Sequence, residues 1–341
     1  MWQIDNHSPF AVGREWIRDV DGREVWIVAV KATYDILADG STRIATEQPP
    51  VLSGPVKDED GSPRYDTDLG PPKPATDIIL AGHAYAQGGR PVTELQAGFQ
   101  VGKLQRMARI VGGRQWKRSL LGTSPTPPES FVCMPLTWTR SLGGTDEPAV
   151  QATGNPVGCG LAVEGALPNI EHPAHPLASL TKLPPVFGFG PVPRHWPWRM
   201  RYAGTYDEVW SNTRRPLQPI DLDPRHWQIA PPEQQYPGYL RGGEEVMLTH
   251  LVPPAIAPKG RLSFQVPKLS LSFETRFYDN TRERSRSRIH TLILEPDHPR
   301  IGVVHHMALP CHPKVNLLDR TIIRVKQRPL DRPLALQGAR S

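Results

Sequence analysis

Hydrophobic residues recur at short intervals near both ends of the chain, in patterns typical of β-strands. Trp26 to Val30 is apolar on both faces, and Asp39-Gly40 separates it from residues 42–45, which predicts an opening β-hairpin. Further strands are predicted at 78–86, 95–101 and 107–111, where apolar residues alternate or cluster. The short spacings between these strands indicate an antiparallel sheet.

Strand-like periodicity returns in the last third of the chain, at 262–266, 269–273, 289–294, 302–307 and 322–325. Between them proline is so frequent that helix interiors and central strands cannot run far, because each proline removes a backbone donor and fixes φ. The chain is therefore predicted to form one compact unit of three segments, with a frayed tail after them. The boundaries are 1–121 for an N-terminal β region, 122–258 for a loop-rich region, 259–326 for a C-terminal β region and 327–341 for the tail.

These patterns predict a mainly β fold of two packed antiparallel sheets or two β-sandwich lobes, with a long irregular insert and few short helices. The insert has four tryptophans among its prolines and glycines: Trp196, Trp198, Trp210 and Trp227. Large aromatic anchors bury enough area to offset the entropy of fixing loops, whereas flexible linkers are poor in aromatics. We therefore expect the segment 154–239 to be ordered and to carry the specific function.

Composition narrows the classes of protein that fit. Prolines number 39 and glycines 29 in 341 residues, which together stay below the roughly 25–30% typical of low-complexity disorder. The net charge of +6 is modest and the carboxylates are interspersed with the bases, so a nucleic-acid partner is not expected. Three widely spaced cysteines indicate reduced thiols. Without an N-terminal apolar run or a membrane-spanning stretch, we expect a cytoplasmic protein with no membrane partner.

Standard catalytic and nucleotide-binding signatures are absent from the sequence. Gly188-Phe-Gly190 is followed by prolines that prevent the helix start needed for phosphate binding. Two groups of possible metal ligands lack the spacing of a closed site: Glu171, His172 and His175, and His305, His306 and His312. We therefore predict no catalytic residue, no cofactor and no metal.

Two charged motifs have both a functional and a structural interpretation. Asp221-Leu-Asp223 matches a tripeptide that can hold a divalent cation and a sugar nucleotide, but a turn-capping role before the following proline is favoured. Arginines alternate with other residues at Arg282, Arg284, Arg286 and Arg288, which on an extended backbone would place four guanidiniums on one side. This basic stripe is interpreted as a solvated edge strand or loop or, less favoured, as a site for an acidic protein or polyanion.

The loops around Trp196-Pro-Trp-Arg199 and Gly204-Thr-Tyr-Asp207, with Trp210 close behind, bring aromatic rings together with opposite charges. They are interpreted either as a recognition loop or as an internally satisfied one. In the second case Asp207 would accept from backbone N–H groups and Arg199 would pair with a carboxylate beneath the rings. The second case is favoured, because a long irregular segment needs such polar contacts to be ordered.

Motifs of small, charged and aromatic residues extend over most of the chain: Val30-Lys31-Ala-Thr33, Asp68-Leu69, Lys73-Pro74, Thr76-Asp77, Gly82 with Ala84, and Gly113-Arg114 with Trp116. The central ones are Asn155-Pro-Val-Gly158 with Gly160, Leu167-Pro-Asn-Ile-Glu171, Trp196 with Arg199, Gly204-Thr-Tyr-Asp207 with Trp210, Asp221 with Asp223, Ala230-Pro231, and Gln234. In this order the chain resembles a bacterial family of domains of unknown function encoded beside type VI secretion genes, whose members serve as effector adaptors or chaperones. It departs from that pattern at Ser141-Leu142, where an aromatic is expected, and at His305-His306, where Trp-Arg is usual.

The resemblance implies a non-catalytic cytoplasmic factor that binds a secreted effector, or its PAAR-like tip domain, and helps to load it on the secretion spike. A groove lined by Trp and Arg would suit such a task. The expected partner-binding residues are Trp196, Arg199, Tyr206, Asp207, Trp210, Asp221, Asp223 and Gln234. The alternative is a carbohydrate-binding or carbohydrate-active β-protein that uses the aromatic loops and the Asp221/Asp223 pair.

Overall fold

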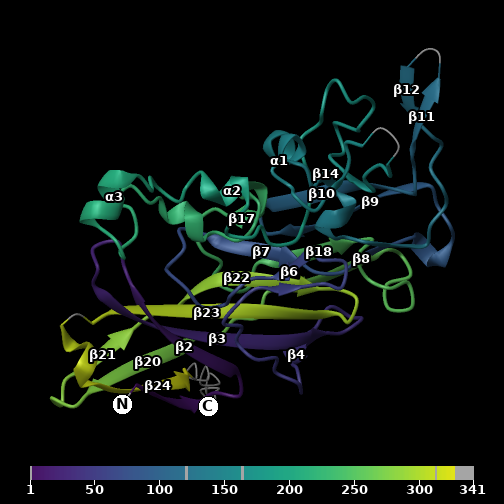
Figure 1. The fold of residues 1–341 in the computed structure, drawn as a ribbon. Helices are drawn as coiled ribbons and strands as arrows, with labels where there is room; N and C mark the ends of the chain where they lie inside the picture. Colours follow the sequence, from purple (N-terminus) through teal and green to yellow (C-terminus); the bar gives the residue numbers. More distant parts are fainter. Residues whose placement is uncertain (1, 120–121, 163–164, 312, 327–341) are drawn as a thin grey trace, which may run out of the picture.

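The computed structural model describes residues 2–119, 122–162, 165–311 and 313–326, and it is mainly β (Figure 1). Its largest sheet runs in the order β17 (Gln235–Tyr236), β7 (Thr76–Leu80), β22 (Arg288–Glu295), β23 (Arg300–Pro310), β3 (Glu24–Ile36) and β2 (Ala11–Arg18), with β4 (Thr42–Ile44) also paired to β3. This sheet combines strands from the beginning and the end of the chain. The predicted tail at 327–341 lies outside the described residues.

Two further sheets complete the main architecture. The five-stranded sheet has the order β16 (Ile170–Glu171), β10 (Leu104–Val111), β9 (Glu94–Val101), β18 (Glu245–Thr249) and β19 (Arg261–Gln265). The four-stranded sheet has the order β1 (Gln3–His7), β24 (Leu318–Val325), β20 (Leu271–Phe277) and β21 (Arg282–Ser285). The two-stranded pairs are β5 (Val56–Lys57) with β6 (Pro63–Tyr65), β8 (His83–Tyr85) with β13 (Cys133–Pro135), β11 (Trp116–Ser119) with β12 (Gly122–Pro125), and β14 (Leu142–Gly143) with β15 (Cys159–Gly160).

Three short helices lie on one side of the large sheet, on the side away from β20 and β24 (Figure 1). They are α1 (Glu147–Thr153), α2 (Pro197–Met200) and α3 (Glu208–Thr213). Helix α1 ends at Gly154, where φ is 72° and an added Cβ would lie 2.1 Å from Trp198 Nε1, so only glycine fits. None of the helices in the described part of the chain has the length and apolar character of a transmembrane span.

The core explains why residues 26–30 are apolar on both faces. One face of β3, with Trp26, Val28 and Val30, joins the main core that the three larger sheets share. The other face, with Ile27 and Ala29, packs under the segment that contains Leu69. Because both faces of the strand are buried, its sequence does not alternate between apolar and polar residues as that of a half-exposed strand does.

A buried polar contact ties the large sheet to the four-stranded sheet. Trp26 Nε1 donates to Thr321 Oγ1 on β24 at 2.9 Å, and that hydroxyl also contacts Thr275 Oγ1 on β20 at 2.9 Å. All three side chains are inaccessible to solvent. The contact therefore fixes how the two sheets face each other and satisfies the indole N–H inside the core.

Much of the predicted architecture is confirmed, including the mainly β fold, the few short helices and the β3–β4 hairpin. The single strand predicted at 78–86 is wrong, because β7 ends at Leu80 and β8 pairs with β13 in another sheet. The prediction of purely antiparallel sheets is also wrong for three strand pairs. These pairs are parallel: β1 with β24, β7 with β22, and β14 with β15. Strands β1, β2 and β18 were not expected, and β18 lies within the region predicted to be loops.

Candidate functional site

Arg199 lies on α2 and Trp196 is the N-cap residue directly before it, and both side chains are buried. The Arg199 guanidinium donates to Asp66 Oδ2 at 2.7 Å and to two backbone carbonyl oxygens, both at 2.9 Å. Trp196 packs edge-on against Trp138, with the ring centroids 5.5 Å apart. Burial lowers the pKa of Arg199, and the Asp66 carboxylate opposes that effect. These two residues form a clamp beneath the surface, as the favoured interpretation expected, and they line no exposed groove.

Tyr206, Asp207 and Trp210 organise the start of α3. Asp207 Oδ1 accepts a hydrogen bond from Trp210 N at 2.8 Å, so Asp207 is the N-cap of the helix. Trp210 Nε1 donates to Leu217 O at 2.8 Å, and its ring meets the Tyr206 ring edge-on at 4.7 Å. The indole and the carboxylate thus hold the loop in shape, while the Tyr206 ring stays exposed.

The two carboxylates of Asp221-Leu-Asp223 serve different turns. Asp221 accepts from Thr205 N at 3.0 Å and from Thr205 Oγ1 at 2.7 Å. Asp223 accepts from Arg225 N at 2.8 Å, which caps the turn that begins at Pro224, and it also pairs with the Arg225 guanidinium. The pKa values of both carboxyl groups are lowered, chiefly by the Thr205 backbone N–H for Asp221 and by the Arg225 side chain for Asp223. The turn-capping interpretation is therefore confirmed for Asp223.

Gln234 is buried where the insert meets the large sheet. Its Nε2 donates to the backbone oxygens of Ile78 and Phe189, both at 2.9 Å. The Gln234 side chain is inaccessible to solvent. It therefore connects β7 to the loop at Phe189. Because the side chain is buried, it cannot contact a partner directly and can affect binding only by fixing the conformation of the surrounding loops.

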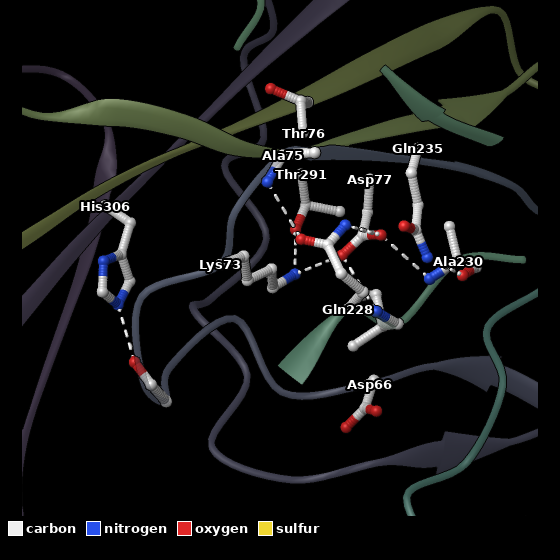
Figure 2. Close-up of polar contacts among 12 residues, drawn as sticks. Asp66, Lys73, Ala75, Thr76, Asp77, Gln228, Ala230, Gln235, Thr291 and His306 are labelled. Carbon is white, nitrogen blue, oxygen red and sulfur yellow. Dashed lines mark hydrogen bonds and ion pairs between the residues drawn. The ribbon is translucent and has the colours of Figure 1, made fainter. Parts of the chain in front are cut away.

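A buried carboxylate, Asp77, anchors the insert to β7 (Figure 2). Its Oδ2 accepts from Lys73 Nζ at 2.8 Å and from Ile229 N at 2.9 Å. Its Oδ1 accepts from Gln228 Nε2 at 2.9 Å and from Ala230 N at 3.0 Å. Four donors, one of them a cation, compensate for removing this charge from water. The arrangement is a structural joint with no oxygen left over for a ligand.

Two histidines stack beside this joint. The rings of His290 and His306 lie parallel with their centroids 4.0 Å apart. His306 Nε2 donates to Gly70 O at 2.9 Å (Figure 2). The Tyr239 ring lies nearly parallel to the His290 ring, with the centroids 6.2 Å apart. Burial lowers the pKa of His306 to about 4 and holds the pKa of His290 well below its usual value. Both imidazoles therefore stay neutral at physiological pH.

Four exposed large apolar side chains lie between residues 200 and 220, on α2, on α3 and in the loops next to them. They are Met200, Tyr206, Val209 and Ile220, which are 47, 54, 67 and 72% exposed. Thr205 and Asp221 are hydrogen-bonded, which places their chain neighbours Tyr206 and Ile220 close together. We call these four residues the α2–α3 surface. Exposed large apolar side chains concentrated in one short segment make that segment the candidate for an interaction site.

The predicted basic stripe is divided between two sheets. Arg282 and Arg284 lie on β21, an edge strand of the four-stranded sheet, so the edge-strand interpretation is confirmed for them. Arg286 follows in the connecting loop, and Arg288 begins β22 of the large sheet. The expectation of four guanidiniums along one extended strand is therefore wrong, although all four side chains are exposed.

The residues around His172 and His175 that were considered as metal ligands are engaged in ion pairs and ring contacts. Glu171 pairs with Arg109 at 2.6 Å and with Arg114 at 2.7 Å, so both of its oxygens are engaged. His172 and His175 pack ring to ring, 4.8 Å between centroids. Within the described ranges, no three His, Cys, Asp or Glu side chains gather as metal ligands would. His312 lies outside those ranges.

The ion pairs inside the molecule were not chosen as site residues from the sequence. Lys31 pairs with Asp68 at 3.1 Å and Lys73 with Asp77 at 2.8 Å, both almost fully buried. Each of these residues belongs to a motif of the family resemblance, which was the only signal for them in the sequence. Partners 37 residues apart, as in Lys31 and Asp68, leave no local spacing to detect.

The sequence profile of one protein family, described as an uncharacterized protein conserved in bacteria (DUF2169), matches residues 21–306. This match includes the large sheet except β2 and the end of β23, together with the whole insert and the α2–α3 surface. No curated protein and no solved structure matches the sequence.

Proposed function

The chain belongs to the bacterial family DUF2169, and from this premise we propose that it is a non-catalytic adaptor or chaperone for a secreted protein. The client is a type VI secretion effector or its PAAR-like tip domain, which the adaptor binds in the bacterial cytoplasm and helps to load on the spike. The resemblance of the sequence motifs supports the secretion link. The α2–α3 surface carries the proposal, because it is apolar, exposed and held in shape from below.

A rigid base suits an adaptor. Arg199 fixes α2 through three hydrogen bonds and Asp207 caps α3, so the exposed side chains above them lose little freedom on binding. Preorganisation of this kind lowers the entropy that association must overcome. An aromatic such as Tyr206 beside aliphatic neighbours is also the composition of a binding hot spot.

One cluster contains residue types that catalysis can use. Asp297 Oδ2 lies 2.8 Å from His83 Nδ1 in a cleft, and Cys133 is close to Asp297. Burial raises the pKa of the Cys133 thiol, so the nucleophilic thiolate is disfavoured at neutral pH. The Tyr85 hydroxyl occupies the other oxygen of Asp297 at 3.0 Å. This cluster is better described as a hydrogen-bonded corner of β8.

The experiment is co-expression with the products of the neighbouring genes, followed by affinity purification of this chain. Val209→Glu with Ile220→Glu places two charges on the α2–α3 surface and should reduce client recovery by about tenfold or more. Ile44→Glu with Val132→Glu is the matched control, since both residues are exposed apolar side chains on other parts of the molecule. The control should recover the client at the wild-type level.

Both variants must keep the wild-type melting temperature for the comparison to count. Equal client recovery with all three proteins would refute the role of the α2–α3 surface. A purified chain that hydrolyses or binds a glycan without any protein client would refute the adaptor itself.

A further inference from the structure

A cleft of about 650 Å³ opens between the loop at 238–241, the start of β22 and the end of β24. Four cationic side chains line it: Arg241, Arg286, Arg288 and Lys326. Among the described residues that line this cleft, none is acidic. It lies elsewhere in the sequence and fold than the α2–α3 surface, and it includes the second half of the sequence-predicted arginine stripe.

The wall of the cleft is built to stay in place. Thr76 Oγ1 donates to Ile289 O at 2.5 Å and accepts from Leu240 N at 3.0 Å, so one hydroxyl joins the loop to β22. The Tyr239 hydroxyl donates to Lys73 O. Arg288 lies over the Tyr239 ring, 4.6 Å from its centroid, and the ring in turn stacks on His290. A rigid loop therefore holds Arg288 at the cleft.

The other three cations of the cleft are without a partner among the described residues. In the part of the chain that the structure describes, neither Arg241, Arg286 nor Lys326 makes a side-chain hydrogen bond or an ion pair. Cations collected in a concave site without carboxylates create a positive potential that attracts anions. Most of the other arginines on strand β20 and β21 surfaces, such as Arg276 and Arg284, face Glu274 instead.

His305 also lines the cleft. It is only 4% exposed, and its Nε2 has neither solvent-accessible surface nor a hydrogen-bond partner among the described residues. The imidazole is therefore part of the wall behind the cations and offers no polar contact to a ligand in the cleft.

We propose that this cleft binds an acidic, extended segment of a partner protein. The cations come from three separate chain segments around a large volume, a spread that suits successive carboxylates better than a single phosphate. Among the described residues that line the cleft, Tyr239 is the only Phe, Tyr or Trp, and its ring is already stacked on His290. Single-stranded nucleic acid needs free stacking platforms. The proposal does not depend on the identity of the client or on the α2–α3 surface.

The test is fluorescence anisotropy with a labelled peptide of alternating glutamate and serine, at low salt and at physiological salt. The wild-type chain should bind it, and more weakly at the higher salt. The cleft variant Arg241→Ser with Arg286→Ser should bind about tenfold more weakly. Arg282→Ser with Arg284→Ser removes the same charge from the neighbouring strand β21 and should stay within about twofold of wild type.

Equal weakening in both variants would overturn the proposal, because net charge alone would then explain binding. No binding of the peptide at low salt would also overturn it. So would tighter binding of a short DNA duplex than of the peptide, which would assign the cleft to nucleic acid. The probe is a free peptide and no client is present. These results are therefore independent of the test of client recovery through the α2–α3 surface.

Discussion

At the scale of single residues, two buried charged side chains are held by several hydrogen bonds each. Asp77 has four donors and Arg199 three acceptors, and both hold loop segments against the large sheet. A buried charge is tolerated only with such partners, and the loss of one partner leaves the other uncompensated. These residues therefore contribute to a unique loop conformation more than to chemistry.

Arg199→Ala is expected to lower the free energy of unfolding by about 3–5 kcal/mol, because the Asp66 carboxylate and two carbonyl groups lose their donor. Urea denaturation followed by tryptophan fluorescence measures it. Arg225→Ala is the matched control, since it removes an arginine from an exposed pair with Asp223, and it should leave the unfolding curve unchanged. An Arg199 variant as stable as this control would contradict the clamp.

Acid should destabilise the protein partly through His306. Burial lowers the pKa of His306 to about 4, whereas the unfolded chain titrates near 6.5. Between these values the unfolded state binds more protons, so the stabilisation is present above pH 6.5 and is lost as the pH falls towards 4. The full window corresponds to roughly 3 kcal/mol.

The measurement is the free energy of unfolding of wild type and His306→Gln across this pH window. Glutamine keeps an N–H donor for Gly70 O but does not titrate, so the variant should show a flatter pH dependence. His7→Gln, at an exposed histidine, should retain the wild-type slope. Parallel curves for wild type and His306→Gln would refute this cause of acid sensitivity.

At the scale of elements, α3 is a six-residue helix that depends on its cap. Asp207→Ala removes the acceptor for Trp210 N and should weaken α3 by about 1 kcal/mol. Client binding should fall while the global melting temperature stays constant, since α3 lies outside the core. Asp207→Asn retains a capping oxygen and should bind the client like wild type. Equal losses in both variants would show that the carboxylate, and not the cap, matters.

Strands with a regular apolar pattern could be predicted from the sequence, and strands defined by distant partners could not. The pattern at 95–101 predicted β9, because its alternate residues face the core. In contrast, β1 is a short, mostly polar strand whose pairing with β24 joins the two ends of the chain. Strand β18 was hidden among prolines and glycines, although Val246 and Leu248 alternate into the core.

The same division applies to the candidate site. The cap by Asp207 and the pairing of Arg199 with a carboxylate followed from residue types that need such partners. That the partner is Asp66, 133 positions away, did not follow, because only the tertiary fold brings them together. The exposure of Val209 and Ile220 could not be predicted from the sequence either. In an irregular segment without periodicity, an apolar residue can be buried in the core or exposed on the surface.

At the scale of the whole molecule, three sheets share one core and the insert rests on the large sheet through Asp77 and Gln234. The α2–α3 surface lies on the helical side (Figure 1), and the cationic cleft lies where the loop after β17 meets the ends of β22 and β24. A rigid body with separate apolar and cationic surfaces is suited to holding a protein partner. The account thus requires that binding leave the core unchanged.

Hydrogen–deuterium exchange of the chain, alone and in complex with its co-purified client, tests the central claim most directly. The account predicts slower exchange in the complex at residues 200–220, with the core strands β3 and β23 exchanging at the same slow rate in both samples. If exchange at 200–220 is the same in the two samples while protection arises elsewhere, the α2–α3 surface is not the client-binding site.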